Sequence, residues 1–223
     1  MASAEVPRQA AAGTSAGDAP LVWIDCEMTG LDPDTDEILE VYCVVTTGDL
    51  ELVDEAGFHA VVHWPQSRLD GMDDWCRATH GGSGLTAAVV ASTTTAAQAA
   101  EGLYRYVAGL VPERRTGLLA GNSVHADRAF LRRGPWAPVV DHLHYRLLDV
   151  SAIKEAARRW SPAGVLAAAP RKRGRHLARD DILESIAEAR FYRDAIFSTA
   201  QRQGQKTEED EGGEDEERRA GTA

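Results

Sequence analysis

The chain has 223 residues, 43% of them hydrophobic and 26% charged, and a formal net charge of −11. This length and composition are typical of one globular domain with a sizeable core. The acidic balance argues against broad electrostatic capture of nucleic acid, but it leaves room for a small site in which metal ions and a few arginines handle a short oligonucleotide.

Cysteine usage and hydropathy indicate the cellular compartment of the protein. Cys26, Cys43 and Cys76 are odd in number and widely spaced, which fits a reducing compartment and argues against a disulfide framework or a zinc knuckle. No apolar stretch approaches the ~20 residues of a membrane span, and the N-terminus lacks the apolar core of a secretory signal. We therefore expect a cytoplasmic protein without membrane association.

The two ends of the chain differ in composition from its middle. Residues 1–19 are rich in Ala, Gly, Ser and Thr without periodicity, which predicts a disordered leader. Residues 201–223 are polar and charged, which predicts a disordered acidic tail. One folded domain, residues 20–200, lies between them.

The first half of this domain reads as strands. Residues 21–27 and 38–46 form apolar runs, and residues 50–53 and 58–62 are shorter extended pieces beyond a turn. Together they predict a three-stranded antiparallel meander.

Strand–helix alternation follows in the second half. Apolar residues recur at helical spacing from residue 94 to residue 110 and stop before Pro112. The other expected elements are strands at 117–121 and 147–150 and helices at 127–133, 151–160 and about 177–200. Hairpins first and alternation afterwards predict an α/β fold with a mixed sheet flanked by helices. The carboxyl ends of the strands would then carry the site.

Two carboxylates end the first expected strand. Asp25 and Glu27 are two residues apart, and side chains at this spacing point to the same face of a strand. Adjacent carboxylates repel each other unless a cation lies between them. Because hard oxygen ligands suit Mg²⁺ or Mn²⁺, the pair predicts a divalent metal site.

Three further residues could complete such a site. Asp127 and Asp181 come from expected helices, and His176 lies just before or at the start of the last one. A metal-ion nuclease needs acids from several elements, because two cations about 4 Å apart must hold both the attacking and the leaving oxygen. A neutral imidazole nearby could take a proton from the attacking water.

Taken together, these residues resemble the DEDDh group of 3′-to-5′ exonucleases. The matching pattern is Asp25-x-Glu27, Asp127 and His176-x4-Asp181. The local strings at 23–31, 121–128, 144–151 and 180–186 are similar to those of the oligoribonuclease family, in unbroken order over about residues 20–200. The resemblance implies a ribonuclease-H-like mixed five-stranded sheet flanked by helices.

The resemblance also implies roles for these residues. Asp25, Glu27, Asp127 and Asp181 would hold two divalent cations, Mg²⁺ or Mn²⁺, and His176 would be the general base. Helical spacing from His176 alone would favour Asp180 over Asp181 as the acid, whereas the family register assigns Asp181.

The implied substrate is short single-stranded RNA with a free 3′ end, from dinucleotides to a few nucleotides, released as 5′-mononucleotides. Leu31 matches a residue that wedges between bases, and Trp75 and His80 match residues that pack against base and phosphate. Stacking on an aromatic face tolerates any base. Without the resemblance, Trp75 could equally be a core residue. Its polar neighbours suggest a partly exposed loop.

A homodimer is implied as well. Tyr145 matches a tyrosine of the active site, and Arg146 and Ser151 would reach the partner's site and cap the 5′ phosphate. Ser123 would hydrogen-bond either to the substrate or to the backbone of its own motif.

Some features stay open or depart from the family pattern. The basic run 171–175 could attract phosphate or simply be solvated, and the glycine-rich segment 81–84 is expected to be a flexible loop. His176 is followed by Leu-Ala-Arg179 where the family usually has Arg-Ala-Leu. Tyr42 replaces a small or aliphatic residue. These departures spare the metal and base positions and concern the phosphate contacts.

Two rival functions remain. A DEDDh exonuclease acting on longer RNA or DNA ends would share the same acids, but a cap from residues 145, 146 and 151 should block long chains. A non-catalytic nucleic-acid-binding or adaptor protein could keep the fold and work through the acidic tail. The complete set of acid and base positions argues against that rival.

Overall fold

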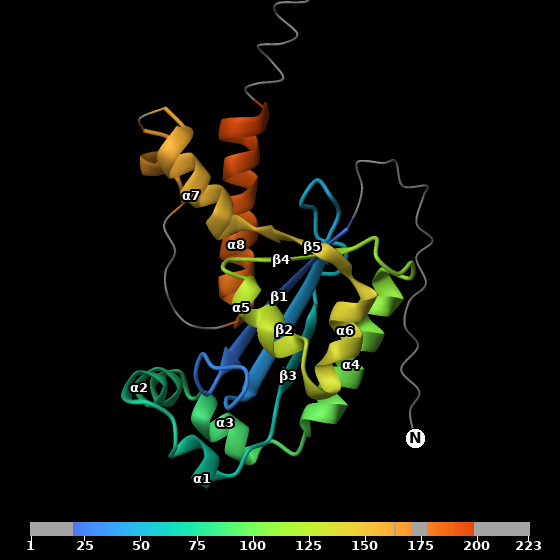
Figure 1. The fold of residues 1–223 in the computed structure, drawn as a ribbon, viewed down its shortest axis with the longest axis vertical. Helices are drawn as coiled ribbons and strands as arrows, with labels where there is room; N and C mark the ends of the chain where they lie inside the picture. Colours follow the sequence, from blue (N-terminus) through green and yellow to red (C-terminus); the bar gives the residue numbers. More distant parts are fainter. Residues whose placement is uncertain (1–19, 163, 171–177, 199–223) are drawn as a thin grey trace, which may run out of the picture.

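A five-stranded mixed sheet forms the frame of the domain in the computed structural model, which describes residues 20–162, 164–170 and 178–198 (Figure 1). The strands are β1 (Leu21–Met28), β2 (Ile38–Thr46), β3 (Phe58–Val61), β4 (Leu118–Gly121) and β5 (His144–Asp149), in the order β3-β2-β1-β4-β5. β1, β2 and β3 pair antiparallel, and β4 and β5 run parallel to β1. The predicted meander and mixed sheet are thereby confirmed. The expected leader and tail, the basic run 171–175 and His176 lie outside the described residues.

Helices cover both faces of this sheet. Those before β4 are α1 (Gln66–Leu69), α2 (Asp74–Ser83), α3 (Leu85–Ala91) and α4 (Ala96–Leu110). Those after β4 are α5 (His125–Leu131), α6 (Ala137–His142), α7 (Val150–Trp160) and α8 (Ala178–Tyr192). Short 3₁₀ turns lie at Gly134–Trp136 and Leu166–Ala168, and a π-helical turn, Arg193–Phe197, follows α8. No helix in the described part of the chain is long and apolar enough to cross a membrane.

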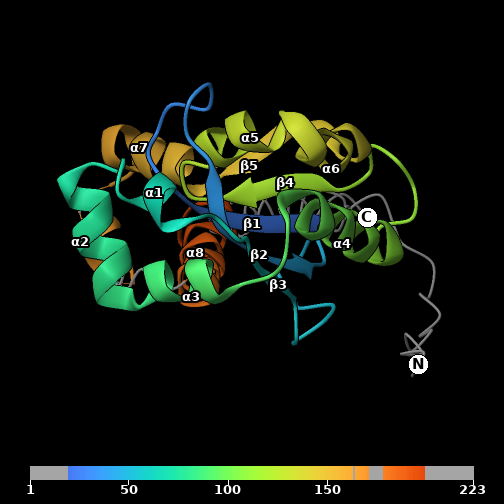
Figure 2. The same ribbon diagram turned by 90° about the horizontal axis from the view of Figure 1, so that it is seen from below.

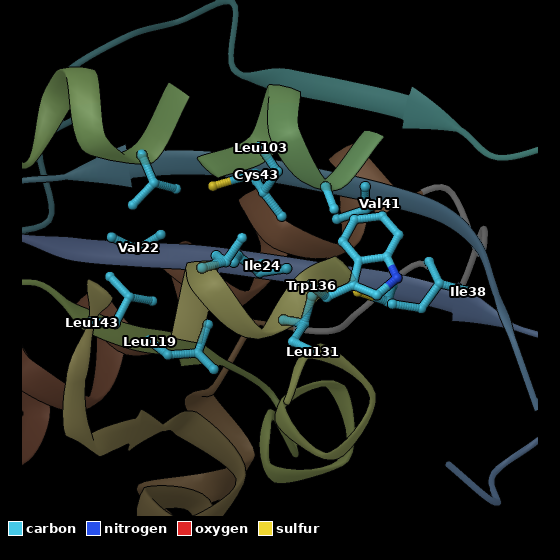
Figure 3. Packing of buried hydrophobic residues seen from close by; sticks show 14 of the residues in the cluster. Val22, Ile24, Ile38, Val41, Cys43, Leu103, Leu119, Leu131, Trp136 and Leu143 are labelled. Atoms are coloured by element: carbon cyan, nitrogen blue, oxygen red, sulfur yellow. The ribbon is translucent and has the colours of Figure 1, made fainter. Parts of the chain in front are cut away.

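Alternation along β1 sorts its side chains between two cores. Val22, Ile24 and Cys26 face a core that includes residues of α4, α5 and α6 (Figure 3). Leu21 and Trp23 face the opposite side, where they pack with residues of α7 and α8. Because Asp25 and Glu27 continue the odd-numbered series, their side chains lie on the α8 side of the sheet.

The helix predicted for residues 94–110 is confirmed as α4, and its start has a clear local cause. The Thr95 hydroxyl accepts the Gln98 backbone N–H at 3.2 Å, and the Gln98 side chain accepts the Thr95 backbone N–H at 2.9 Å. This reciprocal capping box satisfies donors that the first helical turn leaves unpaired.

The segment between β3 and α4 is more helical than expected. α1, α2 and α3 gather at one end of the molecule (Figures 1 and 2). The flexible loop predicted for residues 81–84 is wrong, because Gly81–Ser83 belong to α2 and Gly84 ends that helix with a left-handed φ of 83°. Trp75 is likewise in a helix rather than a loop. A small core that includes Leu39, Leu69 and Leu85 outweighs the low helix propensity of the glycines.

Other boundaries shift without changing the topology. Residues 50–53 form only an isolated bridge, Thr46 to Leu52, because Leu50 takes a left-handed φ of 68° in the turn. β5 begins at His144 rather than at residue 147, since the parallel ladder with β4 supports a polar, exposed stretch. α8 ends at Tyr192, and the π-helical turn Arg193–Phe197 continues the helical path close to the predicted end near residue 200.

Candidate active site

Three carboxylates from two distant parts of the chain meet at the carboxyl end of β1. Each of Asp25, Glu27 and Asp181 offers an oxygen, and these oxygens all lie within 4.8 Å of one another. The first two leave β1 on the same face, and Asp181 comes from the first turns of α8. The structure therefore places in one cluster the acids that the family register assigns, with Asp181 rather than Asp180 as the third member.

Local structure explains why these acids converge. α8 lays Ile182 and Ile186 on the apolar face of the sheet that contains Trp23 and Val44, which brings the helix start to the end of β1. The pairing of β1 with β2 is regular up to Glu27 and shifts register immediately after it. Such a bulge bends a strand away from its partner. β1 ends at Met28, one residue beyond its second acid.

The cluster is electrostatically suited to a cation. Burial raises the pKa of Glu27 to about 7, and the negative charges of Glu40, Asp181 and Asp127 add to the shift. A partly buried carboxylate among other carboxylates is destabilised when it ionises, unless a positive charge compensates it. Three hard oxygen donors match Mg²⁺ or Mn²⁺ better than a soft-ligand metal. The residues present therefore fit a divalent ion.

Asp127 lies beside this cluster and has a different contact. Its Oδ1 accepts the backbone N–H of Cys26, between the two acids of β1, at 2.9 Å. The side chain is buried, and burial raises its pKa to about 7. The four predicted acids are thus brought together, but only three form the close oxygen cluster within the described residues.

A cavity of about 440 Å³ opens next to Glu27. Its lining includes Leu31, Trp75, His80 and Cys76. Leu31 is 84% exposed and Trp75 is 61% exposed, so neither serves as a core residue. The structure therefore gathers three of the predicted substrate contacts around one pocket beside the acids.

His80 is the buried member of this group. Its Nε2 lies 2.9 Å from the Met28 carbonyl, and its Nδ1 lies 3.9 Å from a carboxylate oxygen of Glu27. Because a carbonyl only accepts, Nε2 carries the hydrogen of that bond. His80 thus ties α2 to the end of β1 and fixes the pocket wall.

The loop that carries Leu31 is held by Asp36. The Asp36 carboxylate accepts the Thr29 hydroxyl at 2.8 Å and the Asp32 backbone N–H at 3.0 Å. A Cβ at Gly30 would lie only 2.3 Å from this carboxylate, so the close approach requires glycine. The loop position of Leu31 follows from this packing.

Ser123 and Ser151 form a second polar group, between the turn before α5 and the first turn of α7. Their hydroxyls are 3.1 Å apart, and both backbone N–H groups donate to Asp149 Oδ1, at 2.9 and 3.0 Å. Ser123 has a left-handed φ of 52°, an unfavourable conformation for a residue with a Cβ. Asp149 compensates for that strain by fixing both backbones.

Tyr145 and Arg146 lie elsewhere, on the exposed surface of β5. Tyr145 is 69% exposed, stacks on His144 at 4.5 Å and carries the Arg146 guanidinium 5.4 Å from its ring centre. Neither residue lines the pocket of its own chain. The structure of one chain therefore does not bring these two residues to the acids.

The structure adds polar residues that the sequence did not single out. Asn122 and Glu188 contact each other behind the cluster, and Glu188 is only 2% exposed. The two departures from the family pattern also meet, since Arg179 Nε donates to the Tyr42 hydroxyl at 3.1 Å. The periodicity of the sequence does not predict that Glu188 is buried, because polar and apolar residues are mixed on that face of α8.

Comparison with known proteins places the chain in a class. The exonuclease family model of the RNase T type matches residues 22–189. Solved structures of exonuclease I share the fold: the Escherichia coli enzyme in complex with a dA16 oligonucleotide aligns with a TM-score of 0.61 at 15% identity, over 79% of this chain and 41% of that one. The chain is an exonuclease of the RNase T class, and the predicted ribonuclease-H-like fold is confirmed.

Curated relatives narrow that class. The mitochondrial oligoribonuclease of Saccharomyces cerevisiae is 45% identical, over 82% of this chain and 69% of the yeast protein. The human mitochondrial oligoribonuclease is 44% identical, over 85% and 80%. The oligoribonuclease of Chromobacterium violaceum is 47% identical, over 78% and 93%. The chain therefore belongs to the oligoribonuclease family, as its motifs predicted.

Proposed function

We propose that this protein is a 3′-to-5′ exoribonuclease that hydrolyses very short oligoribonucleotides, from dinucleotides to a few nucleotides, to 5′-mononucleotides. The observation that carries the proposal is the convergence of Asp25, Glu27 and Asp181 beside a pocket lined by Leu31 and Trp75. The names of the relatives support the same substrate class.

The acids supply the metal site in this proposal. Asp25, Glu27 and Asp181 would hold divalent ions, with Asp127 alongside, and the preference for Mg²⁺ or Mn²⁺ follows from the all-oxygen donors. When bound, such ions stabilise the charge that develops on the phosphodiester and favour ionisation of the attacking water. His176 would accept the proton of that water.

The pocket supplies the preference for short chains. Leu31 and Trp75 present an aliphatic and an aromatic face, on which any base can stack. A volume of about 440 Å³ falls within the range of small-ligand sites and fits one or two nucleotides rather than a long strand. Ser151, together with Arg146, would cap the 5′ phosphate in the partner's site, and Ser123 would hydrogen-bond either to the substrate or to the backbone of its own motif.

A homodimer would complete the site. Tyr145 and Arg146 are exposed on β5, an edge strand of the sheet, and do not line their own pocket. Supplied by the partner subunit, they would close the pocket over the 5′ end and exclude long chains. The Tyr145 ring and the Arg146 guanidinium already form a cation–π pair that could act as one unit.

We also propose that the protein acts in the cytoplasm. The three cysteines are free and buried, which supports a reducing compartment and hence the cytoplasm. The yeast and human relatives are, by name, mitochondrial proteins. Fractionation of cells that express the tagged chain would decide between the two locations.

The decisive measurement is the rate of hydrolysis across RNA length. With Mg²⁺ or Mn²⁺, we expect 5′-labelled diribonucleotides to be cleaved much faster than chains of about ten nucleotides, because Tyr145 and Arg146 supplied by the second subunit would close the pocket over the 5′ end. Equal rates on dinucleotides and on 20-mers would favour the longer-substrate exonuclease. An intact dinucleotide after prolonged incubation with metal would refute the proposal.

A single substitution tests the metal role. Asp25→Ala removes one of the three clustered carboxylates, and we expect it to abolish nearly all turnover, since loss of a metal ligand costs several kcal/mol of barrier. Activity above about a tenth of the wild-type rate would contradict the assigned role. The Asp49→Ala variant, at a surface turn, is the matched control and should retain full activity.

A further inference from the structure

A hydrogen-bonded network behind the carboxylate cluster joins α8 to the turn after β4. Asn122 Nδ2 donates to Ser185 Oγ at 2.9 Å and lies 3.3 Å from Glu188 Oε2. Ser185 Oγ in turn donates to the backbone carbonyl of Asp181 at 2.7 Å. The network thus ends on the residue that supplies the third clustered carboxylate.

Glu188 sets the direction of these bonds. Its buried carboxylate also receives the Tyr192 hydroxyl at 3.2 Å and the Lys154 ammonium at 3.2 Å. A carboxylate paired with an ammonium ion accepts and does not donate, so the NH₂ group of Asn122 must face it. The Asn122 amide oxygen then faces the Ser151 hydroxyl, at 3.3 Å. With its amide oriented in this way, Asn122 can donate to Ser185.

Asp181 needs such support more than the other acids of the cluster do. Asp25 and Glu27 lie on β1, the central strand, whereas Asp181 lies in the first turns of a helix. Helix starts have unpaired N–H groups and fray easily. Three carboxylates within 4.8 Å repel one another, and this repulsion acts to push the start of α8 away from β1.

We propose that Asn122 and Ser185 are positioning residues that hold the start of α8 against the turn after β4, so that Asp181 stays in metal-binding position before the ion arrives. Glu188 is the anchor that orients Asn122. This inference rests on the metal site proposed above. Residues that orient ligands from behind commonly change metal affinity by about 10- to 100-fold when they are removed.

The test is a titration of the protein with Mn²⁺ in the absence of RNA. Electron paramagnetic resonance measures the concentration of free Mn²⁺ and hence the affinity. We expect Ser185→Ala and Asn122→Ala to weaken Mn²⁺ binding by about tenfold or more. Because all three ligand carboxylates remain, saturating Mn²⁺ should restore most of kcat on a diribonucleotide. If Asn122→Ala does not fold, Ser185→Ala decides alone, since it removes one hydroxyl from a helix that tolerates alanine.

Thr46→Val is the matched control. The Thr46 hydroxyl accepts the Trp23 indole N–H at 2.9 Å, so this variant also loses one buried hydrogen bond, but at the start of β1 and away from the cluster. It should lower the melting temperature and leave Mn²⁺ affinity unchanged. If Ser185→Ala behaves like this control, with Mn²⁺ affinity within about twofold of wild type, the positioning role is overturned. Absence of Mn²⁺ binding by the wild-type protein would instead overturn the proposed metal site itself.

Discussion

Glu27 couples the site to pH. Burial and neighbouring acids raise its pKa to about 7, so the folded protein holds a proton that the unfolded chain releases near pH 4.5. A carboxyl with a raised folded-state pKa therefore lowers the free energy of unfolding as the pH rises through that window. Asp127, whose pKa is raised to about 7, adds in the same direction. A cation that binds the ionised acids offsets this fall in the free energy of unfolding.

We accordingly expect the stabilisation by Mn²⁺ to grow with pH. Melting temperatures with and without Mn²⁺ should differ little at about pH 5.5 and strongly at about pH 8, since protons and metal compete for the same oxygens. In the Glu27→Gln variant the side chain cannot ionise. The shift in melting temperature caused by Mn²⁺ should therefore increase much less between these two pH values. An equal Mn²⁺ effect at both pH values would contradict the assignment.

Trp75 tests the stacking role at a single side chain. It lines the pocket and is 61% exposed, so its removal should leave the melting temperature nearly unchanged. Base–aromatic stacking contributes ~1–3 kcal/mol, so Trp75→Ala should raise KM for a diribonucleotide roughly 5- to 150-fold. Trp75→Phe keeps an aromatic face and should lose much less. Equal losses in both variants would point to shape rather than stacking.

At the level of elements, the start of α8 is held from two sides. Ser185 ties it to the turn after β4, and Arg179 ties it to Tyr42 on β2. Tyr42 and Arg179 both depart from the family pattern, and their contact suggests that the two changes belong together. The Tyr42 hydroxyl also donates to the Ala56 carbonyl at 2.8 Å, so it serves as acceptor and donor at once.

A double-mutant cycle tests this pairing. Tyr42→Phe and Arg179→Ala should each lower the free energy of unfolding. The double variant should lose less than the sum, by about 0.5–3 kcal/mol, as is usual for residues in contact. Denaturant unfolding measures all four proteins. Strict additivity would mean that the contact contributes nothing to stability. Arg105→Ala paired with Tyr42→Phe is the distant control pair.

Much of the architecture could be predicted from the sequence because its elements follow simple periodicities. β1 and β2 are long apolar runs, and α4 combines a helical period with a capping box. α2 could not be predicted, because its glycines have a low helix propensity and the helix is stabilised by tertiary packing. The start of β5 was missed because an exposed polar strand depends on its ladder with β4 and not on its own side chains.

The residues of the candidate site also divide into those that the sequence predicts and those that only the structure reveals. The Asp25 and Glu27 pair is visible in the sequence, because the two residues share one strand face. The proximity of Asp181 required the family register, since no local rule joins residues that are far apart in the chain. Asn122 and Glu188 could not be anticipated, because the burial of a charged residue is decided only when the helix is packed.

At the scale of the whole molecule, the proposed dimer makes a quantitative prediction. Sedimentation or light scattering should give twice the chain mass. Asp25→Ala and Arg146→Ala variants should each be inactive on diribonucleotides. After subunit exchange at equal amounts, about a quarter of the sites should recover, because a mixed dimer with two-fold symmetry contains one site with both residues intact.

Two observations would contradict this account. A monomeric but fully active protein would show that one chain suffices. A mixture of the two variants that stays inactive, although the mixed dimer forms, would show that Arg146 acts within its own subunit. Leu52→Ala, another exposed side chain, is the control partner and should be active before and after mixing with wild type.

Among the described elements, the acids of the cluster lie on β1, which comes first along the chain, and on α8, the last α-helix. On the ribosome, synthesis proceeds from the N-terminus. Asp25 and Glu27 therefore leave the exit tunnel long before Asp181. A nascent or prematurely released chain that lacks α8 has an incomplete metal site, whatever the state of its sheet. Competence to cut RNA consequently arises only after α8 has been synthesised.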